Sequence, residues 1–262
     1  MLELPEKIKS ILALSDYQSD TVGMSEATIL LFEDKVLKID KIREESEHER
    51  DVMLWLKDRL PVPEVICHET YNGQSYLLMS RLPGVMCCDE TYLKRPQELT
   101  KILAAGLKML WEVDISKCDY NCNLDKKLDM ARYNAEHDLV DVNNVEPETF
   151  GENGFQSPKH LLDWLEQNRP EEDIVFSHGD YCLPNIFIEN GKISGFLDLG
   201  KTGCADRYQD IALCYRSLKH NYEGKYGGKT YEGFDPDSLF DQLGIEPDWD
   251  KIRYYILLDE LF

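Results

Sequence analysis

The first eighty residues alternate short runs of β-prone apolar residues with one long amphipathic segment. The runs "ATILLF" and "KVLKI" are separated by two acidic residues, and "EVICHET" and "QSYLLMS" are separated by "YNG". Each pair is the signature of a β-hairpin. Between the pairs, "EESEHERDVMLWLKDRL" places Val52, Leu56 and Leu60 at helical spacing and stops before two prolines. The pattern predicts an antiparallel sheet with one helix, residues 44–60, packed on it.

After "RLPGVMCC" the apolar pattern becomes helical, and it predicts helices over 96–113, 124–137 and 158–168. Two short strands, "NIFIEN" and "KISGFLD", then flank an Asn-Gly turn dipeptide, and helices are expected from there to the end of the chain. The sequence therefore predicts an α+β protein with two lobes. These are a β-rich N-terminal lobe, residues 1–82, and a mostly helical C-terminal lobe, residues 83–262.

Composition and charge narrow the class of protein. The 262 residues carry a net charge of −21, which opposes binding to nucleic acid or to an anionic membrane and favours a cationic ligand. No apolar run approaches the roughly 20 residues that span a bilayer, and the N-terminus has no signal-peptide pattern. We therefore expect a cytoplasmic protein. The eight cysteines include no CxxC pair, so free thiols are expected rather than disulfides or a structural zinc site.

Three polar residues in and after "HGDYCLPNIF" have a spacing that suggests chemistry. Asp180 is followed five residues later by Asn185, and Asp198 follows in "GFLDLGKTG". The predicted hairpin brings Asn185 and Asp198 close together, and their hard oxygen ligands suit Mg²⁺ when phosphates supply the remaining ligands. Asp180 would then face a substrate hydroxyl.

This arrangement resembles the catalytic machinery of protein kinases, where H-R-D-x-x-x-x-N and D-F-G supply the base and the metal ligands. Such a site needs a lysine on the N-lobe sheet and an acidic residue on the adjacent helix. Lys38 lies within an apolar strand and is the candidate. Glu49, three residues before Val52 on the same predicted helix face, is its expected partner, with Glu45 as the alternative.

Two further segments are predicted to bind the nucleotide. In "GMSEAT", the backbone amides of Met24 and Ser25 are expected to contact phosphates. In "LLMSRLPG", backbone groups of Ser80 and Leu82 are expected to bind an adenine beneath Met79. The segment "GKYGGKT", residues 224–230, is one residue too short for a phosphate-binding P-loop and has no strand before it, so we interpret it as a surface loop.

"HGD" replaces H-R-D, and only a short segment separates "DLG" from the helix "RYQDIALCYRSL", so the substrate should be small. The segments "VFSHGD", "GFLDLGKTGCADRYQDIALCYRS" and "PDWDKIRYYILLDELF" are similar to bacterial aminoglycoside 3'-phosphotransferases, in particular the type III enzymes. The resemblance implies a bilobal protein-kinase-like fold. The protein is expected to be a monomer or a homodimer. The resemblance also implies ATP, with GTP as an alternative, and Mg²⁺. The implied reaction is γ-phosphoryl transfer to the 3'-hydroxyl of a cationic aminoglycoside antibiotic, which confers resistance.

The resemblance also implies residue roles. Asp180 is the catalytic base or hydroxyl-orienting group, Asn185 and Asp198 bind Mg²⁺, and Lys38 holds the α- and β-phosphates with Glu49 orienting it. An acidic antibiotic pocket is expected near the C-terminus and in an upstream acidic loop, and its predicted members are Arg216, Asp259, Glu260, Phe262, Glu146 and Glu148.

Three departures from that family pattern leave other functions open. Leu183 and Pro184 replace an Asp-Ser pair, His220 replaces an acidic residue, and Val36 replaces an aromatic residue that stacks on adenine. One alternative is a kinase of another small amino alcohol or amino sugar, such as choline. Another is a protein that binds a nucleotide or sequesters an antibiotic without catalysis, although the Lys, Asp, Asn and Asp positions of a kinase are all present.

Overall fold

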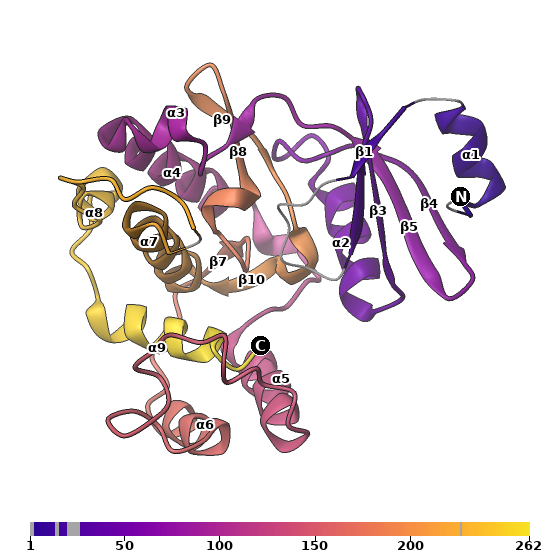
Figure 1. The fold of residues 1–262 in the computed structure, drawn as a ribbon. Helices are drawn as coiled ribbons and strands as arrows, with labels where there is room; N and C mark the ends of the chain where they lie inside the picture. Colours follow the sequence, from indigo (N-terminus) through magenta and orange to yellow (C-terminus); the bar gives the residue numbers. More distant parts are fainter. Residues whose placement is uncertain (1–2, 14–15, 20–26, 226) are drawn as a thin grey trace. The chain divides into compact units, whose positions relative to one another are not determined.

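The structure, a computed structural model, describes residues 3–13, 16–19, 27–225 and 227–262 (Figure 1). The chain divides into two compact units. The first comprises residues 1–86 and 185–201, and the second comprises residues 87–184 and 202–262. These units differ from the predicted lobes, 1–82 and 83–262, chiefly because a hairpin from the later part of the chain groups with the N-terminal residues.

The first unit is built on a five-stranded antiparallel sheet with the strand order β1-β2-β3-β5-β4 (Figure 1). Both predicted hairpins, β2/β3 and β4/β5, are present. The β4/β5 turn uses Asn72 and Gly73, which both have positive φ, 48° and 76°, as a two-residue type I′ turn requires. The strands are β1 (Gln18–Ser19), β2 (Thr28–Leu31), β3 (Lys35–Lys41), β4 (Val65–Tyr71) and β5 (Gln74–Ser80).

Two helices belong to the same unit, α1 (Glu6–Leu12) and α2 (Glu44–Leu56). Ile8 and Leu12 of α1 pack in one buried cluster with sheet residues such as Leu37 and Leu78. The predicted end of α2 at Leu60 is wrong by about one turn. The chain leaves the helix at Lys57, whose ψ of 130° lies outside the helical region, and Asp58 then adopts a left-handed conformation, with φ 67°, before the prolines begin.

The second predicted hairpin is also present. Its strands are β8 (Ile186–Glu189) and β9 (Lys192–Phe196), and β8 also pairs with β6 (Val85–Met86). The Phe196 N–H donates to the carbonyl of Pro61 at 3.0 Å, and the short 3₁₀ turn η3 (Leu199–Lys201) packs on α2. These contacts with N-terminal residues explain why the hairpin belongs to the first unit.

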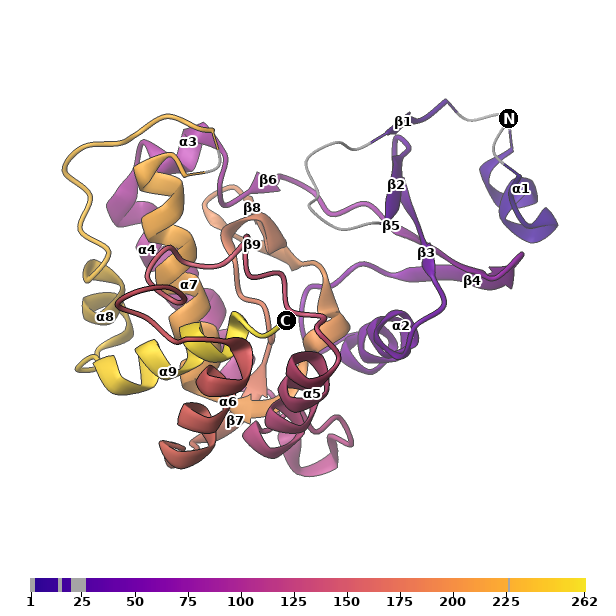
Figure 2. The same ribbon diagram turned by 60° about the horizontal axis from the view of Figure 1, so that its bottom comes forward.

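The second unit is mostly helical. Its helices are α3 (Glu90–Leu93), α4 (Pro96–Trp111), α5 (Leu124–Glu136), α6 (Pro158–Gln167), α7 (Arg207–Glu223), α8 (Ser238–Leu243) and α9 (Trp249–Asp259), with the 3₁₀ turns η1 (Ile115–Lys117) and η2 (Leu183–Asn185), the latter ending in the first unit. The helices predicted over 96–113, 124–137 and 158–168 are confirmed, each ending one or two residues early. Helix α6 contacts both α5 and α9, and α7 contacts α9 (Figure 2).

The expectation that only helices follow the β8/β9 hairpin is wrong. β10 (Gly203–Asp206) precedes α7 and pairs antiparallel with β7 (Ile174–Ser177). The paired segments are short and far apart in the chain, so neither carries the local alternation by which a strand is recognised. This two-stranded ribbon connects directly to the "HGD" segment at one end and to α7 at the other.

Three smaller predictions concern the loop at 224–230, the cysteines and the membrane. Helix α7 leads into the loop and is capped at its C-terminus by Gly224, with φ 71°. A P-loop would follow a strand, so the interpretation as a loop of another kind is supported. Each of the eight cysteines, all within the described part of the chain, is a free thiol. Across the described residues, no helix is both long and apolar enough to cross a bilayer.

Candidate active site

In the first unit, Lys38 of β3 contacts two carboxylates. Its Nζ lies 2.8 Å from Oε2 of Glu49 on α2 and 3.2 Å from Oδ1 of Asp198, which follows β9. The side chains of Lys38 and Glu49 are 16% and 5% exposed, whereas that of Asp198 is 50% exposed. The structure therefore brings together three of the residues that the sequence predicts for a nucleotide site, and Glu49 rather than Glu45 is the ion-pair partner of Lys38.

The pKa values of Lys38 and Glu49 are shifted by burial and by these ion pairs. Burial opposes the charged form of Lys38, but Glu49 and Asp198 outweigh it, so the pKa of Lys38 lies above its ordinary value. Burial raises the pKa of Glu49, and Lys38 acts in the opposite direction. A lysine held in its charged form can bind an anionic phosphate group.

Asn185 and Asp198 lie side by side at the open end of the β8/β9 hairpin, Asn185 just before β8 and Asp198 just after β9. The Leu197 N–H donates to the carbonyl of Asn185 at 2.8 Å, so Asp198 follows a residue that is bonded to Asn185. Asp198 has a left-handed backbone, with φ 56°, an uncommon conformation for a residue other than glycine. A half-exposed carboxylate and an amide oxygen at neighbouring positions are a donor set that fits a hard divalent cation such as Mg²⁺.

The segment predicted to bind adenine lies at the end of β5. Met79 is buried and is the cross-strand partner of Val36 on β3. The Ser80 N–H donates to the carbonyl of Glu64 at 2.9 Å, so this amide is already bonded within the protein. Leu82 lies against Gly195 of β9, where a Cβ would be only 2.4 Å from its methyl groups. The predicted phosphate contacts Met24 and Ser25 lie outside the described residues.

In the second unit, Asp180 lies in a loop that α7 holds through hydrogen bonds. The buried Asp210 carboxylate accepts from the N–H groups of His178, at 2.7 Å, and Gly179, at 2.9 Å. Gly179 has φ 84°, a conformation that favours glycine at this position. Further along the loop, the Leu183 N–H donates to Oγ of Ser217 at 3.0 Å. Asp210 and Ser217 are seven residues apart, so they lie on the same face of α7, and this face fixes the backbone on both sides of Asp180.

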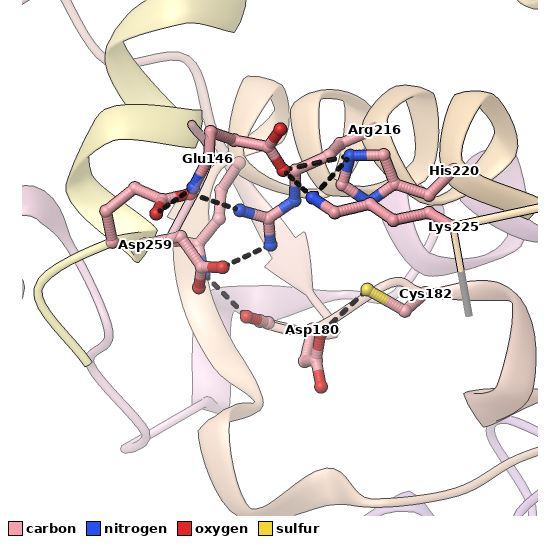
Figure 3. A network of polar contacts seen from close by, with 10 residues as sticks. Glu146, Asp180, Cys182, Arg216, His220, Lys225 and Asp259 are labelled. Atoms are coloured by element: carbon pink, nitrogen blue, oxygen red, sulfur yellow. Dashed lines mark hydrogen bonds and ion pairs between the residues drawn. The ribbon is translucent and has the colours of Figure 1, made fainter. Parts of the chain in front are cut away.

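Four of the six residues predicted to bind the antibiotic, Arg216, Asp259, Glu260 and Glu146, form a connected polar network in the second unit (Figure 3). Arg216 of α7 pairs with Asp259, and it contacts Oε1 of Glu260 at 3.2 Å. The other oxygen of Glu260 accepts from the Glu146 N–H at 2.8 Å. Glu260 is thus buried with both carboxylate oxygens bonded within the protein, which suits it to positioning Arg216 and the loop of Glu146.

A lysine and a histidine of the same unit contact the side chain of Glu146. Its Oε1 lies 2.9 Å from Nε2 of His220 and 2.8 Å from Nζ of Lys225 (Figure 3). Burial alone would raise the pKa of Glu146, but Lys225 and His220 outweigh it, and the pKa lies below its ordinary value. The other predicted members, Glu148 and Phe262, are exposed.

Comparisons with known proteins identify the family to which the chain belongs. The model of the phosphotransferase enzyme family, APH, matches residues 18–255 of this chain. The chain belongs to this family. The predicted resemblance and the assignment as a phosphotransferase are therefore confirmed.

Two relatives within the family match the whole chain, and a third matches most of it. An aminoglycoside 3'-phosphotransferase from Enterococcus faecalis is 39% identical over 100% of this chain and 99% of its own length. One from Staphylococcus aureus has the same identity and the same coverage. The streptomycin 3''-kinase of Streptomyces griseus is 31% identical over 82% of this chain and 79% of its own length.

Solved structures of family members share the fold. The structure of an aminoglycoside-3'-phosphotransferase of type VIII has a TM-score of 0.79 at 24% identity and covers 94% of each chain. That of the aminoglycoside phosphotransferase APH(3'')-Id from Streptomyces rimosus has a TM-score of 0.82 at 24% identity and covers 97% of this chain and 95% of its own. The predicted kinase-like α+β fold is therefore confirmed.

The sequence analysis did not identify three residues that hold the predicted site residues of the second unit in place: Asp210, Ser217 and Lys225. Asp210 follows the start of α7 and resembles an ordinary helix-capping acid, yet it is fully buried. A usable signal was its position on the face of "QDIALCYRSL" that also carries apolar residues. Lys225 belongs to the loop after α7, and nothing in its local sequence indicates a partner at Glu146.

Proposed function

We propose that this phosphotransferase transfers the γ-phosphoryl group of ATP to the 3'-hydroxyl of an aminoglycoside antibiotic and so confers resistance. The observation that carries the proposal is the 39% identity to two aminoglycoside 3'-phosphotransferases over the full chain. The retained Lys38, Glu49, Asp180, Asn185 and Asp198 support a catalytic rather than a purely binding role.

In this proposal the first unit binds the nucleotide. The charged Lys38 holds the α- and β-phosphates, and the buried Glu49 fixes its position. Asn185 and Asp198 would hold Mg²⁺, which neutralises phosphate charge during the transfer. Phosphates bound at Lys38 would compete with Asp198 for the ammonium group, which would leave the Asp198 carboxylate available to hold the cation.

The second unit supplies Asp180, which accepts the hydrogen bond of the substrate hydroxyl and orients its oxygen for in-line attack. The backbone next to it is held by Asp210 and Ser217. Catalysis of this kind depends mainly on positioning and on charge neutralisation, and no covalent enzyme intermediate is required.

The substitution of Leu183 for an acidic residue does not argue against an antibiotic substrate. Leu183 is fully buried and its N–H is bonded to Ser217. Its side chain therefore contributes to the core of the second unit. Asp259, paired with Arg216 but not fully buried, remains the acidic group near the C-terminus that we assign to an ammonium group of the substrate.

The experiment that tests the proposal compares ATP consumption with kanamycin, with tobramycin, which lacks the 3'-hydroxyl, and with choline. Asp180→Asn serves as the catalytic blank. Turnover with kanamycin but not tobramycin is expected. Turnover only with choline would replace the proposal by the amino-alcohol kinase alternative, and ATP binding without transfer to any acceptor would favour a non-catalytic protein.

A further inference from the structure

The thiol of Cys182 lies against the carboxylate of Asp180 (Figure 3). The Sγ atom is 3.0 Å from Oδ1. Because an ionised carboxylate can only accept, the thiol is the donor. Burial raises the pKa of Cys182 well above its ordinary value, and the charge of Asp180 acts in the same direction, so the thiol keeps its proton at neutral pH.

The backbone around this contact has little freedom. The Cys182 N–H donates to the carbonyl of Asp180 at 2.8 Å. On one side, Gly179 is bonded to Asp210, and on the other, Leu183 is bonded to Ser217. With the main chain held in this way, the main remaining freedom of Asp180 is rotation of its side chain, and the contact with Cys182 restricts that rotation.

We propose that Cys182 is a positioning residue that fixes the Asp180 carboxylate in the orientation needed to receive the acceptor hydroxyl. The inference rests on the role assigned to Asp180 under the proposed function, and it adds a residue to which that function gives no part. Orientation of a reacting group counts most in the transition state. Cys182 should therefore affect kcat more than the KM of either substrate.

The first test measures the contact itself and needs no substrate. The infrared S–H stretching band of Cys182 is isolated as the difference between the wild type and Cys182→Ser. A thiol bonded to a carboxylate should absorb at lower frequency than a thiol on a neutral acceptor, and Asp180→Asn should move the band to higher frequency. A band that does not respond to Asp180→Asn would overturn the inference, whatever the substrate of the enzyme proves to be.

The second test is kinetic and compares Cys182→Ala with Cys182→Ser. A single hydrogen bond from a weak donor to a charged acceptor predicts a fall in kcat of about three- to tenfold for the alanine variant, with both KM values within about twofold. The serine variant keeps a donor and should recover most of kcat. Cys118→Ala is the matched control, because this half-buried thiol of the same unit donates to the backbone carbonyl of Tyr120.

Equal kcat values for the wild type and Cys182→Ala would overturn the proposal, and so would a serine variant as slow as the alanine variant. If Cys182→Ala does not fold, the serine variant and the infrared band still decide. The rates are measured with whichever of kanamycin and choline supports turnover, or as ATP hydrolysis if neither does. Absence of turnover with kanamycin would thus contradict only the proposed function. The role of Cys182 is tested separately, by the kcat values of its variants and by its S–H stretching band.

Discussion

Lys38 is shared between two carboxylates that differ in their surroundings. Glu49 is buried on α2, whereas Asp198 is half-exposed beyond β9. Glu49 lies closer to Lys38 than Asp198 does, at 2.8 Å against 3.2 Å, so the pair with Glu49 sets the position of the ammonium group. The exposed carboxylate is the one that can change partners when a ligand binds, which suits the two proposed roles of phosphate binding and metal binding.

Replacement of Glu49 by glutamine should weaken nucleotide binding. The loss of one charged hydrogen bond predicts a KM for ATP that is about tenfold higher and a free energy of unfolding lower by about 1–2 kcal/mol. Lys38 would then be drawn towards Asp198. Steady-state kinetics and urea denaturation measure the two effects. Glu45→Gln, an exposed residue one turn earlier on the same face of α2 and the alternative partner of Lys38, is the control, and an equal rise in KM there would contradict the assignment of Glu49.

Asp180→Ala should remove catalysis without removing ATP binding. A positioned general base contributes roughly 10²- to 10⁴-fold, so we expect kcat to fall by about a thousandfold. ATP affinity, measured by calorimetry, should stay within about twofold, because Asp180 belongs to the second unit and the proposed phosphate ligand Lys38 to the first. Residual turnover near that of the wild type would exclude Asp180 as the base.

At the scale of elements, α7 supports the loop that carries Asp180. Its side chains Asp210 and Ser217 bind the loop backbone, while Arg216 on the same helix binds Asp259. Burial raises the pKa of Asp210, and the hydrogen bonds from His178 and Gly179 oppose that shift. One helix therefore determines the position of Asp180 and that of the acidic groups near the C-terminus.

Asp210→Asn should disturb this support. The amide keeps one acceptor oxygen, but its NH₂ group would face the N–H of His178 or Gly179, and that N–H loses its carboxylate acceptor, at a cost of about 2–3 kcal/mol in the free energy of unfolding. Because Asp180 directly follows Gly179, kcat should fall by more than about tenfold as well. Denaturation and kinetics are compared with Asp241→Asn on the exposed face of α8, which should match the wild type. Wild-type stability for Asp210→Asn would refute the supporting role of α7.

The contact of α7 with the Glu146 loop should respond to pH through His220. Burial lowers the pKa of His220, and Lys225 and Arg216 act in the same direction against Glu146. In the unfolded chain this pKa returns to its ordinary value of about 6.5, so below that pH the unfolded state binds more protons than the folded state. The free energy of unfolding should therefore fall as the pH falls through this value towards the lower folded pKa.

Urea denaturation of the wild type and His220→Gln, from about pH 7.5 to about pH 5.5, tests this expectation. The wild type should lose stability on acidification, and the variant should lose less. If the free energy of unfolding falls equally with pH in the wild type and in His220→Gln, His220 is not the group responsible.

The structure also shows which elements were accessible from the sequence. Asn-Gly turns and local alternation defined the β4/β5 and β8/β9 hairpins, and helical spacing placed Glu49 towards Lys38. The β7/β10 pair was missed because each strand has four residues and its partner is distant in the chain. The role of Asp210 was missed because burial, not residue type, distinguishes it from a helix cap. The contact between Cys182 and Asp180 likewise depends on side-chain orientation, which spacing alone does not define.

At the scale of the whole molecule, chain order and compact units do not coincide. The β8/β9 hairpin carries Asn185 and Asp198 into the unit of Lys38, while the residues just before and after it belong to the unit of Asp180. The proposed metal ligands and the phosphate-binding lysine therefore share one unit. The proposed base and the acidic C-terminal groups share the other. A boundary drawn from the sequence at residue 82 could not separate these roles, because the hairpin lies about a hundred residues beyond it.

The net charge of −21 leads to a prediction about salt that separates the two substrates. A polycationic aminoglycoside is attracted by the field of the whole protein, whereas the ATP anion is repelled, and added salt screens both interactions over about 10 Å or less. Between roughly 0.05 and 0.3 M sodium chloride, the KM for kanamycin should rise about three- to tenfold, while the KM for ATP stays level or falls. Steady-state kinetics at fixed pH measure both. A parallel rise of the two KM values would point to a general effect of salt on the fold and would contradict a role for the acidic field in recruiting the substrate.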